Sequence, residues 1–172
     1  MNYKAKLHTI KTFVFDYDGV LSDGTIWVAN KNIIMRSGNV KDGYAIQYAI
    51  KRGYNIAVLS GGSGTSITER MAMLGVEDVF VSSASKKEIF LDYLKTKELK
   101  REEVLYMGDD IPDYDVMLLA GVATCPKDAC EEIKQVADYI SIFPAGKGCA
   151  RDVIEQVMRL HNQWFYEDGK EW

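Results

Sequence analysis

The chain has 172 residues, 47% hydrophobic and 27% charged, which is typical of a single globular domain spanning residues 1–172. Its net charge of −4 and its dispersed lysines and arginines argue against nucleic acid as a partner, and its apolar runs are too short to cross a membrane. The N-terminal stretch lacks the apolar core of a secretion signal and the three cysteines lack CxxC spacing, so we expect a cytoplasmic protein without disulfides or zinc.

Short β-rich runs alternate along the chain with amphipathic segments. The strand-like runs cover residues 12–17, 55–60, 78–82, 103–110, 122–126 and 138–142, and the helix-like segments cover residues 41–53, 66–74, 86–96, 113–121 and 128–137. This alternation predicts an α/β fold, a doubly wound, Rossmann-like parallel sheet with helices on both faces. A capping box of Ser66 and Glu69 predicts one helix start, and Gly53 and Gly75 predict two helix ends.

Two segments break this alternation. Residues 25–39 form two apolar runs joined around residues 29–32, which predicts a projecting β-hairpin, and its apolar side chains predict packing on a neighbouring subunit. Residues 146–172 form a C-terminal tail that begins with helical spacing at Val153, Val157 and Leu160 and ends in polar and aromatic residues.

Polar clusters follow four of the predicted strands, where ligands collect in a doubly wound sheet. These clusters are Asp16 with Asp18, Ser60 with Gly61 and Gly62, the stretch 82–86 ending in Lys86, and Asp109 with Asp110 and Asp113. Carboxylates that converge in one crevice need a hard cation with oxygen ligands, and Mg²⁺ is the expected cofactor.

The pair Asp16 and Asp18 is suited to phosphoryl transfer. A carboxylate beside a metal ion can attack phosphorus and form an aspartyl phosphate, which makes Asp16 the candidate nucleophile. Asp18 can donate a proton to the leaving alcohol and later activate water. Ser60, the amide of Gly61 and Lys86 can bind the phosphoryl oxygens, and glycines 61 and 62 let the main chain approach a phosphate closely.

The motifs DYDGV, SGG, Lys86 and GDDIPD, in this order at strand ends, resemble those of the haloacid dehalogenase superfamily. The resemblance implies that Asp16 is the nucleophile, that Asp18 is the acid/base, and that Mg²⁺ binds Asp16, the Asp18 carbonyl and Asp109. It also implies that Asp110 and Asp113 orient Lys86 and metal-bound water.

The intervals between these motifs leave no room for a large cap domain. A capless member with a hairpin after DGVLSDG and with the phrase NVKDGYAI is similar to the 3-deoxy-D-manno-octulosonate 8-phosphate (KDO 8-phosphate) phosphatase family of lipopolysaccharide synthesis. That family implies a homotetramer, with a small phosphorylated sugar acid as substrate and a neighbour's segment over each active site. GKGCARD resembles its tail motif. The candidates for substrate binding are Lys41, Arg70, Lys147 and Arg151.

The chain departs from that family at two places. Lys147 stands where arginine is frequent, and Ser60-Gly61-Gly62 stands where TGR is frequent; an ammonium does not reproduce a bidentate guanidinium, so these residues specify the substrate less than the reaction. A sibling group, which acts on nine-carbon 2-keto-3-deoxy sugar acid 9-phosphates, implies the alternative substrate. Ser63 and Gly64 lack the acid of that group and NVKDG fits the eight-carbon group, so the resemblance favours KDO 8-phosphate. Two alternatives belong to other functional classes: a receiver-type phosphoacceptor protein and a noncatalytic assembly protein. The order of the acidic motifs argues against the receiver.

Overall fold

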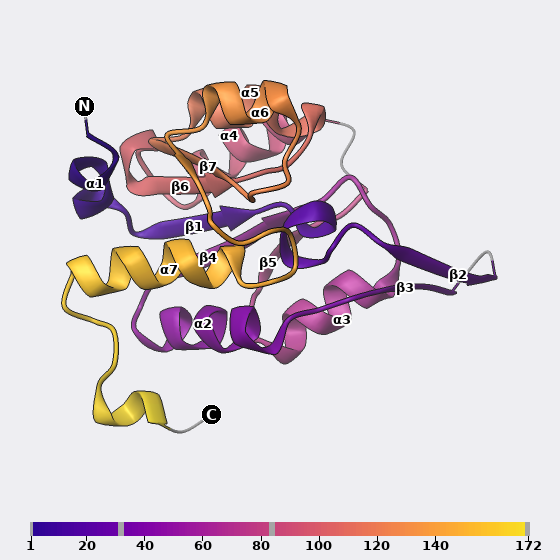
Figure 1. Cartoon of the computed structure of the whole chain (residues 1–172), viewed down its shortest axis with the longest axis horizontal. Coiled ribbons are helices and arrows are strands. Elements are labelled where there is room, and N and C mark those ends of the chain that lie inside the picture. The colour runs from indigo at the N-terminus through magenta and orange to yellow at the C-terminus, as the bar shows by residue number, and fades with distance from the viewer. Residues whose placement is uncertain (1, 31–32, 83–84, 171–172) are drawn as a thin grey trace.

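A parallel sheet of six strands forms the centre of the computed structural model, which describes residues 2–30, 33–82 and 85–170 (Figure 1). The strand order is β5-β4-β1-β6-β7-β8, and all neighbours run parallel. The strands are β1 (Thr12–Phe15), β4 (Asn55–Leu59), β5 (Asp78–Phe80), β6 (Val104–Met107), β7 (Val122–Cys125) and β8 (Tyr139–Ile140). The doubly wound sheet predicted from the sequence is confirmed.

Helices cover both faces of this sheet (Figure 1). One face packs on α2 (Val40–Lys51), α3 (Thr65–Met73) and α7 (Cys149–Leu160), and the other on α4 (Lys86–Thr96), α5 (Tyr114–Leu119) and α6 (Glu131–Val136). Because successive strand residues point to opposite faces, Phe13 and Phe15 enter the first core and Val14 enters the second. Burial on both faces explains why the strands are continuously apolar.

Short helical turns complete the chain. They are α1 (Tyr3–Lys6) and the turns η1 (Leu7–Thr9), η2 (Tyr17–Leu21), η3 (Arg101–Glu103), η4 (Ile111–Asp113) and η5 (Glu167–Lys170). Within residues 2–30, 33–82 and 85–170, no helix is both long and apolar enough to span a membrane.

The predicted helix boundaries are partly correct. Gly53 and Gly75 follow α2 and α3 with φ of 85° and 79°, a conformation that favours glycine, so both predicted helix ends are confirmed. The capping box at Ser66 is wrong, because α3 begins at Thr65 after Gly64 and no side chain caps it. The Ser66 hydroxyl instead accepts a hydrogen bond from Nη1 of Arg36 at 3.2 Å.

The predicted hairpin is present as β2 (Ile26–Asn30) and β3 (Ile33–Arg36), an antiparallel pair that projects from the body of the molecule (Figure 1). Part of its predicted turn, residues 31 and 32, lies outside the described residues. Large apolar side chains on the hairpin are exposed: Ile26, Trp27, Val28, Ile33 and Met35. The part of the chain that the structure describes contains no large cap domain over the sheet, as expected from the short intervals between motifs.

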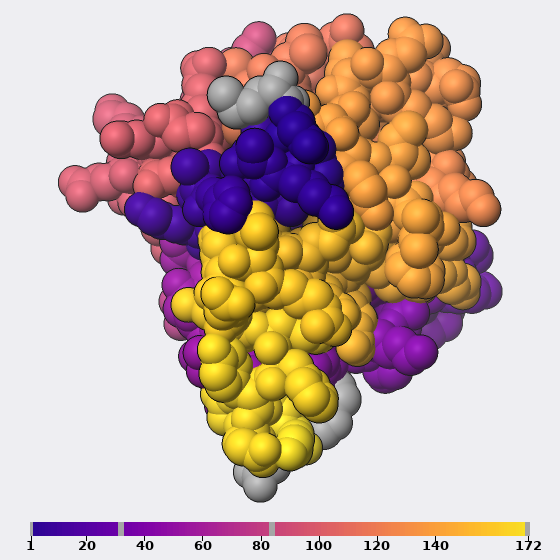
Figure 2. All heavy atoms as spheres, turned by 60° about the vertical axis from the view of Figure 1, so that its left-hand side comes forward, coloured from indigo at the N-terminus to yellow at the C-terminus, as the bar shows by residue number. Residues whose placement is uncertain are grey.

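The C-terminal segment 146–172 is not a tail throughout, because α7 belongs to the core. Val153 and Val157 are fully buried under the sheet, so the helical spacing marks a core helix. Beyond α7 the chain turns back along α2, where the Trp164 ring makes T-shaped contacts with the rings of Tyr44 and Tyr48. Figure 2 shows the N-terminal segment in indigo lying directly against the C-terminal segment in yellow.

Candidate active site

The polar clusters predicted at the strand ends meet at the carboxyl edge of the sheet. They line a cavity of about 210 Å³ whose walls are Asp16, Asp18, Ser60, Gly61, Gly62, Lys86, Asp109, Asp110, Pro112 and Asp113. Residues from the ends of β1, β4 and β6 and from the start of α4 therefore share one site, as parallel topology requires.

Asp16 directly follows β1, and its carboxylate is buried. Oδ1 accepts a hydrogen bond from the amide of Tyr17 at 2.6 Å, and Oδ2 lies 3.0 Å from Nζ of Lys86. Gly19 then reverses the chain with φ of 86°. A Cβ atom at this glycine would lie 2.0 Å from Oδ2 of Asp109, so the turn brings the main chain close to a second carboxylate.

Lys86 is buried at the first turn of α4 and connects two acids. Its Nζ lies 2.6 Å from Oδ1 of Asp113 as well as 3.0 Å from Asp16. Although burial opposes its charge, these two carboxylates raise the pKa of Lys86, so the side chain is an ammonium ion at neutral pH. Asp113 also accepts hydrogen bonds from the hydroxyl of Tyr106 at 2.5 Å and the amide of Asp109 at 3.1 Å.

Three carboxylates converge around this single ammonium. Oxygen atoms of Asp16, Asp109 and Asp113 lie within 4.8 Å of one another, the spacing of a metal site. Burial, and next the charge of Asp113, raise the pKa of Asp16 and raise that of Asp109 to about 7. The site is therefore short of positive charge, and a hard divalent cation with oxygen ligands such as Mg²⁺ fits this donor set.

Asp18 makes an ion pair that sequence analysis missed. Both of its carboxylate oxygens accept hydrogen bonds from Nε of Arg36, at 2.7 and 3.0 Å, and Oδ1 also accepts one from Ser22 at 3.2 Å. Arg36 comes from the base of the hairpin, 18 residues away in the sequence. The sequence does show an arginine, Arg36, at the end of an exposed apolar strand. That position alone does not indicate that Arg36 pairs with Asp18.

Ser60 and the two glycines after it form the turn beyond β4. The Ser60 side chain is almost fully buried, and its hydroxyl oxygen accepts a hydrogen bond from the amide of Gly62 at 3.1 Å. A Cβ atom at Gly61 would meet nothing within 4 Å, so open space adjoins the main chain where an anion could bind.

Asp110 lines the same cavity as Lys86 and Asp113. Its carboxylate accepts a hydrogen bond from the amide of Ile111 at 2.9 Å and caps η4. Asp113 is the residue that pairs with Lys86. The amide of Asp110 in turn donates a hydrogen bond to Oδ2 of Asp113 at 3.5 Å, so the two acids are joined at this turn. That both orient Lys86 and metal-bound water stays a prediction.

The four candidates for substrate binding fall in two places. Lys41, Lys147 and Arg151 line a cavity of about 520 Å³ beside α7, whereas Arg70 lies under Gly43 on the other side of α2. The Arg151 guanidinium packs over the ring of Trp164 at 5.3 Å. Thus the structure brings three of the four side chains together and places one apart.

Asp42 binds two residues that line this second cavity, Gly148 and Arg151, and sequence analysis did not single it out. Its buried carboxylate accepts hydrogen bonds from the amides of Gly148 at 3.1 Å and Arg151 at 2.8 Å. These amides belong to the N-terminal end of α7, where orphan donors favour a negative charge. Asp42 therefore fixes the GKGCARD segment against the start of α2.

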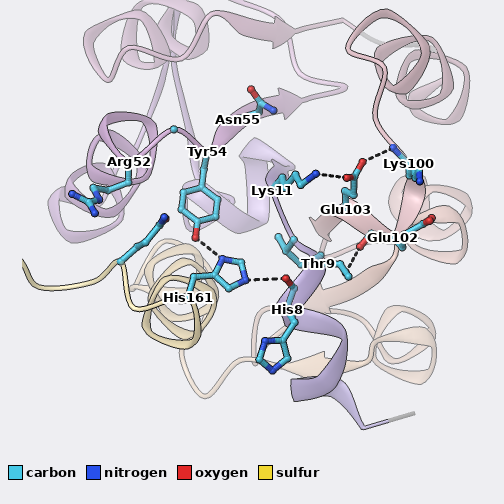
Figure 3. Close-up of a pocket in the computed structure, with 13 residues that line it drawn as sticks. His8, Thr9, Lys11, Arg52, Tyr54, Asn55, Lys100, Glu102, Glu103 and His161 are labelled. Carbon is cyan, nitrogen blue, oxygen red and sulfur yellow. Dashed lines mark hydrogen bonds and ion pairs between the residues drawn. The ribbon is translucent and has the colours of Figure 1, made fainter.

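A larger cavity, about 740 Å³, lies at the amino edge of the sheet, away from the acidic cluster (Figure 3). Its ionic and polar groups pair with one another: Lys11 with Glu103 at 2.6 Å, and the Tyr54 hydroxyl with Nδ1 of His161 at 2.6 Å. The carboxyl edge is the better candidate for catalysis, because its charges converge without mutual compensation.

Known proteins with the same fold and motifs were found by comparison. The haloacid dehalogenase-like hydrolase family matches residues 74–151. The KDO 8-phosphate phosphatase KdsC of Escherichia coli K12 is 32% identical over 154 residues, which are 90% of this chain and 82% of that protein. KdsC of Yersinia pestis is 29% identical over 149 residues, 87% of this chain and 80% of its own length.

Two solved structures extend the comparison. The KDO 8-phosphate phosphatase of Moraxella catarrhalis, in complex with magnesium, phosphate and KDO, has a TM-score of 0.90 at 28% identity and covers 94% of this chain and 93% of its own. The cobalt-bound phosphatase of Haemophilus influenzae has a TM-score of 0.89 at 28% identity, with coverage of 96% and 98%.

Fold, site and likenesses together define a haloacid dehalogenase-like hydrolase with an acidic metal site. Within that class, the chain belongs to the KDO 8-phosphate phosphatase family, since a relative 32% identical to it aligns over nine-tenths of its length.

Proposed function

We propose that this protein is a phosphatase that hydrolyses KDO 8-phosphate to KDO and inorganic phosphate. The observation that carries the proposal is the buried Asp16 carboxylate, held by Lys86 at 3.0 Å beside Asp109 and Asp113. This arrangement supplies a nucleophile, a fixed positive charge and a metal site within one small cavity.

Mg²⁺ is the proposed cofactor, and Asp16, the Asp18 carbonyl and Asp109 would hold it. When bound, it supplies the positive charge that offsets both the carboxylates and the phosphoryl oxygens. The carboxylate oxygens of this chain support a bound Mg²⁺, because three carboxylates converge and the ammonium of Lys86 pairs with only two of them.

The reaction takes place in two displacements at phosphorus. An oxygen of Asp16 attacks, the bond between phosphorus and O8 of the sugar breaks, and the proton of Asp18 passes to that oxygen. Asp18, now a carboxylate, takes a proton from water, whose oxygen attacks the aspartyl phosphate. Breaking the bond to Asp16 releases phosphate and restores the nucleophile.

Donors around the cavity stabilise the charge that develops on the phosphoryl oxygens. Lys86 is charged and buried, and Asp113 holds its ammonium in place through an ion pair of 2.6 Å. The Ser60 hydroxyl and the open main chain at Gly61 provide further hydrogen-bond donors. Asp110 acts on this site through the turn that it caps.

The eight-carbon substrate is supported by the curated relatives and by the Moraxella catarrhalis structure that contains KDO. Lys41, Lys147 and Arg151 are proposed to attract the negative charges of the sugar acid, because they line one cavity. Arg70, which lies apart, is retained as a weaker candidate for the same role. The cytoplasmic location inferred from the sequence stays a prediction.

We also propose a homotetramer in which hairpins pack on one another and a neighbour covers the active site. The support is the exposed apolar surface of β2 and β3, where Trp27 is 47% exposed and Val28 is 63% exposed. Large exposed apolar patches are typical of interfaces. Light scattering after gel filtration measures the state, and charged substitutions at Trp27 and Val28 should yield smaller species.

Phosphate release in the presence of Mg²⁺ tests the activity. KDO 8-phosphate, a nine-carbon 2-keto-3-deoxy acid 9-phosphate and 4-nitrophenyl phosphate are compared, with Asp16→Asn as the inactive control. Preference for the eight-carbon ester supports the proposal. Preference for the nine-carbon ester keeps the mechanism and replaces the substrate, and a single phosphorylation without turnover identifies a receiver. Absence of any reaction leaves an assembly protein.

A further inference from the structure

The base of the hairpin delivers a buried guanidinium to the edge of the active site. Arg36 is the last residue of β3, and only 4% of its side chain is exposed, although its neighbour Met35 is 50% exposed. Removing a guanidinium from water is unfavourable unless acceptors and an opposite charge surround it. The partners of Arg36 therefore identify its role.

Those partners come from three separate segments. Nε of Arg36 donates to both carboxylate oxygens of Asp18, at 2.7 and 3.0 Å. Nη1 donates to the carbonyl oxygen of Ser63 at 3.0 Å and to the hydroxyl of Ser66 at 3.2 Å. Because the guanidinium is planar and fixed at two ends, it holds the Asp18 carboxylate in one orientation.

Gly62 makes room for this ion pair. A Cβ atom at Gly62 would lie 2.7 Å from Nη2 of Arg36 and 2.7 Å from Oδ2 of Asp18. Gly62 and Asp18 line the active-site cavity, and Arg36 packs against both from the hairpin side. The small residue at position 62 is thus complementary in shape to the arginine at position 36.

We propose that Arg36 is a positioning residue for Asp18 in the hydrolysis of sugar phosphates. The inference rests on the proposed function, in which Asp18 gives its proton to the leaving sugar oxygen. As the bond between phosphorus and O8 breaks, the electron pair and that proton end on O8, and Asp18 becomes a carboxylate. Arg36, which is anchored on the Ser63 carbonyl and the Ser66 hydroxyl, fixes the side chain of Asp18 in the orientation from which this transfer takes place.

Two phosphate esters whose leaving groups differ in acidity distinguish positioning of Asp18 by Arg36 from a purely structural role of Arg36. A sugar alkoxide needs a proton in order to leave, whereas 4-nitrophenolate leaves without one. The ratio kcat/KM reports the steps up to departure of the leaving group for both esters. For Arg36→Gln we expect kcat/KM with KDO 8-phosphate to fall about 30- to 100-fold, and kcat/KM with 4-nitrophenyl phosphate to stay within about threefold.

Three further variants sharpen the test. Asp18→Asn should show the same discrimination, and the double variant with Arg36→Gln should be no worse than Asp18→Asn alone, because the two residues act as one unit. Arg36→Lys keeps the charge without the planar fork and should lose less than Arg36→Gln. The matched control is Arg101→Gln, which replaces an exposed arginine at the amino edge. It should leave kcat/KM unchanged for both KDO 8-phosphate and 4-nitrophenyl phosphate.

A milder variant, Ser66→Ala, tests the positioning role even if Arg36→Gln fails to fold. Ser66→Ala removes one anchor of the guanidinium and leaves Asp18 untouched, so the selective loss on the sugar ester should persist at about two- to fivefold. Circular dichroism and thermal unfolding establish that each variant is folded.

Equal losses on the two esters in folded Arg36→Gln and Ser66→Ala would overturn the positioning role, and so would unchanged kcat/KM on both. These outcomes leave the proposed function standing, since wild-type protein still hydrolyses KDO 8-phosphate. If the wild-type protein hydrolyses neither ester, the proposed function itself fails, and the role of Arg36 fails with it.

Discussion

At the carboxyl ends of the strands, the carboxylates of Asp16, Asp109 and Asp113 lie within 4.8 Å of one another and Lys86 pairs with two of them, whereas at the amino ends Lys11 pairs with Glu103. The amino-edge cavity is the larger, about 740 Å³ against about 210 Å³. Its groups nevertheless satisfy one another, while the acidic site has more carboxylates than the ammonium of Lys86 can pair. The size of a cavity is therefore a poorer guide to chemistry than unbalanced charge.

The largest expected effect is that of Asp16→Asn at the carboxyl edge. An amide is a poor nucleophile, so turnover should fall by at least about 10³-fold while the fold persists. Because burial raises the pKa of Asp16, its ionised form opposes folding at neutral pH, and the neutral amide should raise the Tm without Mg²⁺. Phosphate release and calorimetry measure the two effects, and normal turnover would refute the assigned nucleophile.

A matched pair of glycines compares the two edges directly. Gly19 and Gly53 have φ of 86° and 85°, so alanine at either should be destabilising by about 1–2 kcal/mol. Space distinguishes them, because a Cβ atom at Gly53 would meet nothing within 4 Å and one at Gly19 would displace Asp109.

Gly19→Ala should therefore lose both thermal stabilisation by Mg²⁺ and turnover, the latter by about 10²-fold, whereas Gly53→Ala should keep both. Thermal unfolding with and without Mg²⁺, together with phosphate release, measures the difference. Similar activities of the two variants would show that the turn at Gly19 does not position Asp109.

The pair of glycines also illustrates how far the sequence predicts the structure. Both glycines stand at local signals, a strand end and a helix end, so strands, helix ends and the acidic cluster could be predicted. Contacts between distant segments could not: Arg36 reaches Asp18 across the hairpin, and Asp42 binds the amide of Arg151 109 residues later. Such pairings depend on three-dimensional packing, which no local spacing encodes.

The stabilisation by Mg²⁺ should depend on pH. Without metal, the raised pKa of Asp109, about 7, means that the folded state binds a proton more tightly than the unfolded state. The associated stability is present at low pH and is lost as the pH rises through 7. Mg²⁺ binds the ionised carboxylate, so protons compete with Mg²⁺ for Asp109. The Kd of Mg²⁺ should therefore be about tenfold higher at pH 6 than at pH 8.

Calorimetric titration of Mg²⁺ in buffers of different ionisation enthalpy counts the protons that are released. We expect release at pH 6 and little at pH 8, with a larger rise in Tm on adding Mg²⁺ at pH 8. An equal affinity at both pH values would mean that the acidic cluster does not bind the metal. The paired charges of the amino edge provide no such linkage to Mg²⁺.

The smallest effect is expected at the amino edge, at His161. Its Nε2 lies 3.1 Å from the carbonyl oxygen of Leu7 and 3.2 Å from that of His8, and Figure 3 shows the contacts with His8 and Tyr54. Because a carbonyl oxygen can only accept, Nε2 carries the hydrogen and Nδ1 accepts from Tyr54. Burial raises the pKa of Tyr54 to about 12, which keeps this phenol a donor. His161→Ala removes the hydrogen bonds to Tyr54, Leu7 and His8 and the stacking of its ring on Tyr54.

The loss should be about 1–2 kcal/mol, a fall in Tm of several degrees for a chain of this length, with turnover unchanged. Tyr54→Phe is the matched variant, since it keeps the ring and removes only the hydroxyl. A loss of turnover in either variant, at a temperature where it is fully folded, would show that the amino edge influences the chemistry. The contrast between a reactive and a structural edge of the sheet would then no longer hold.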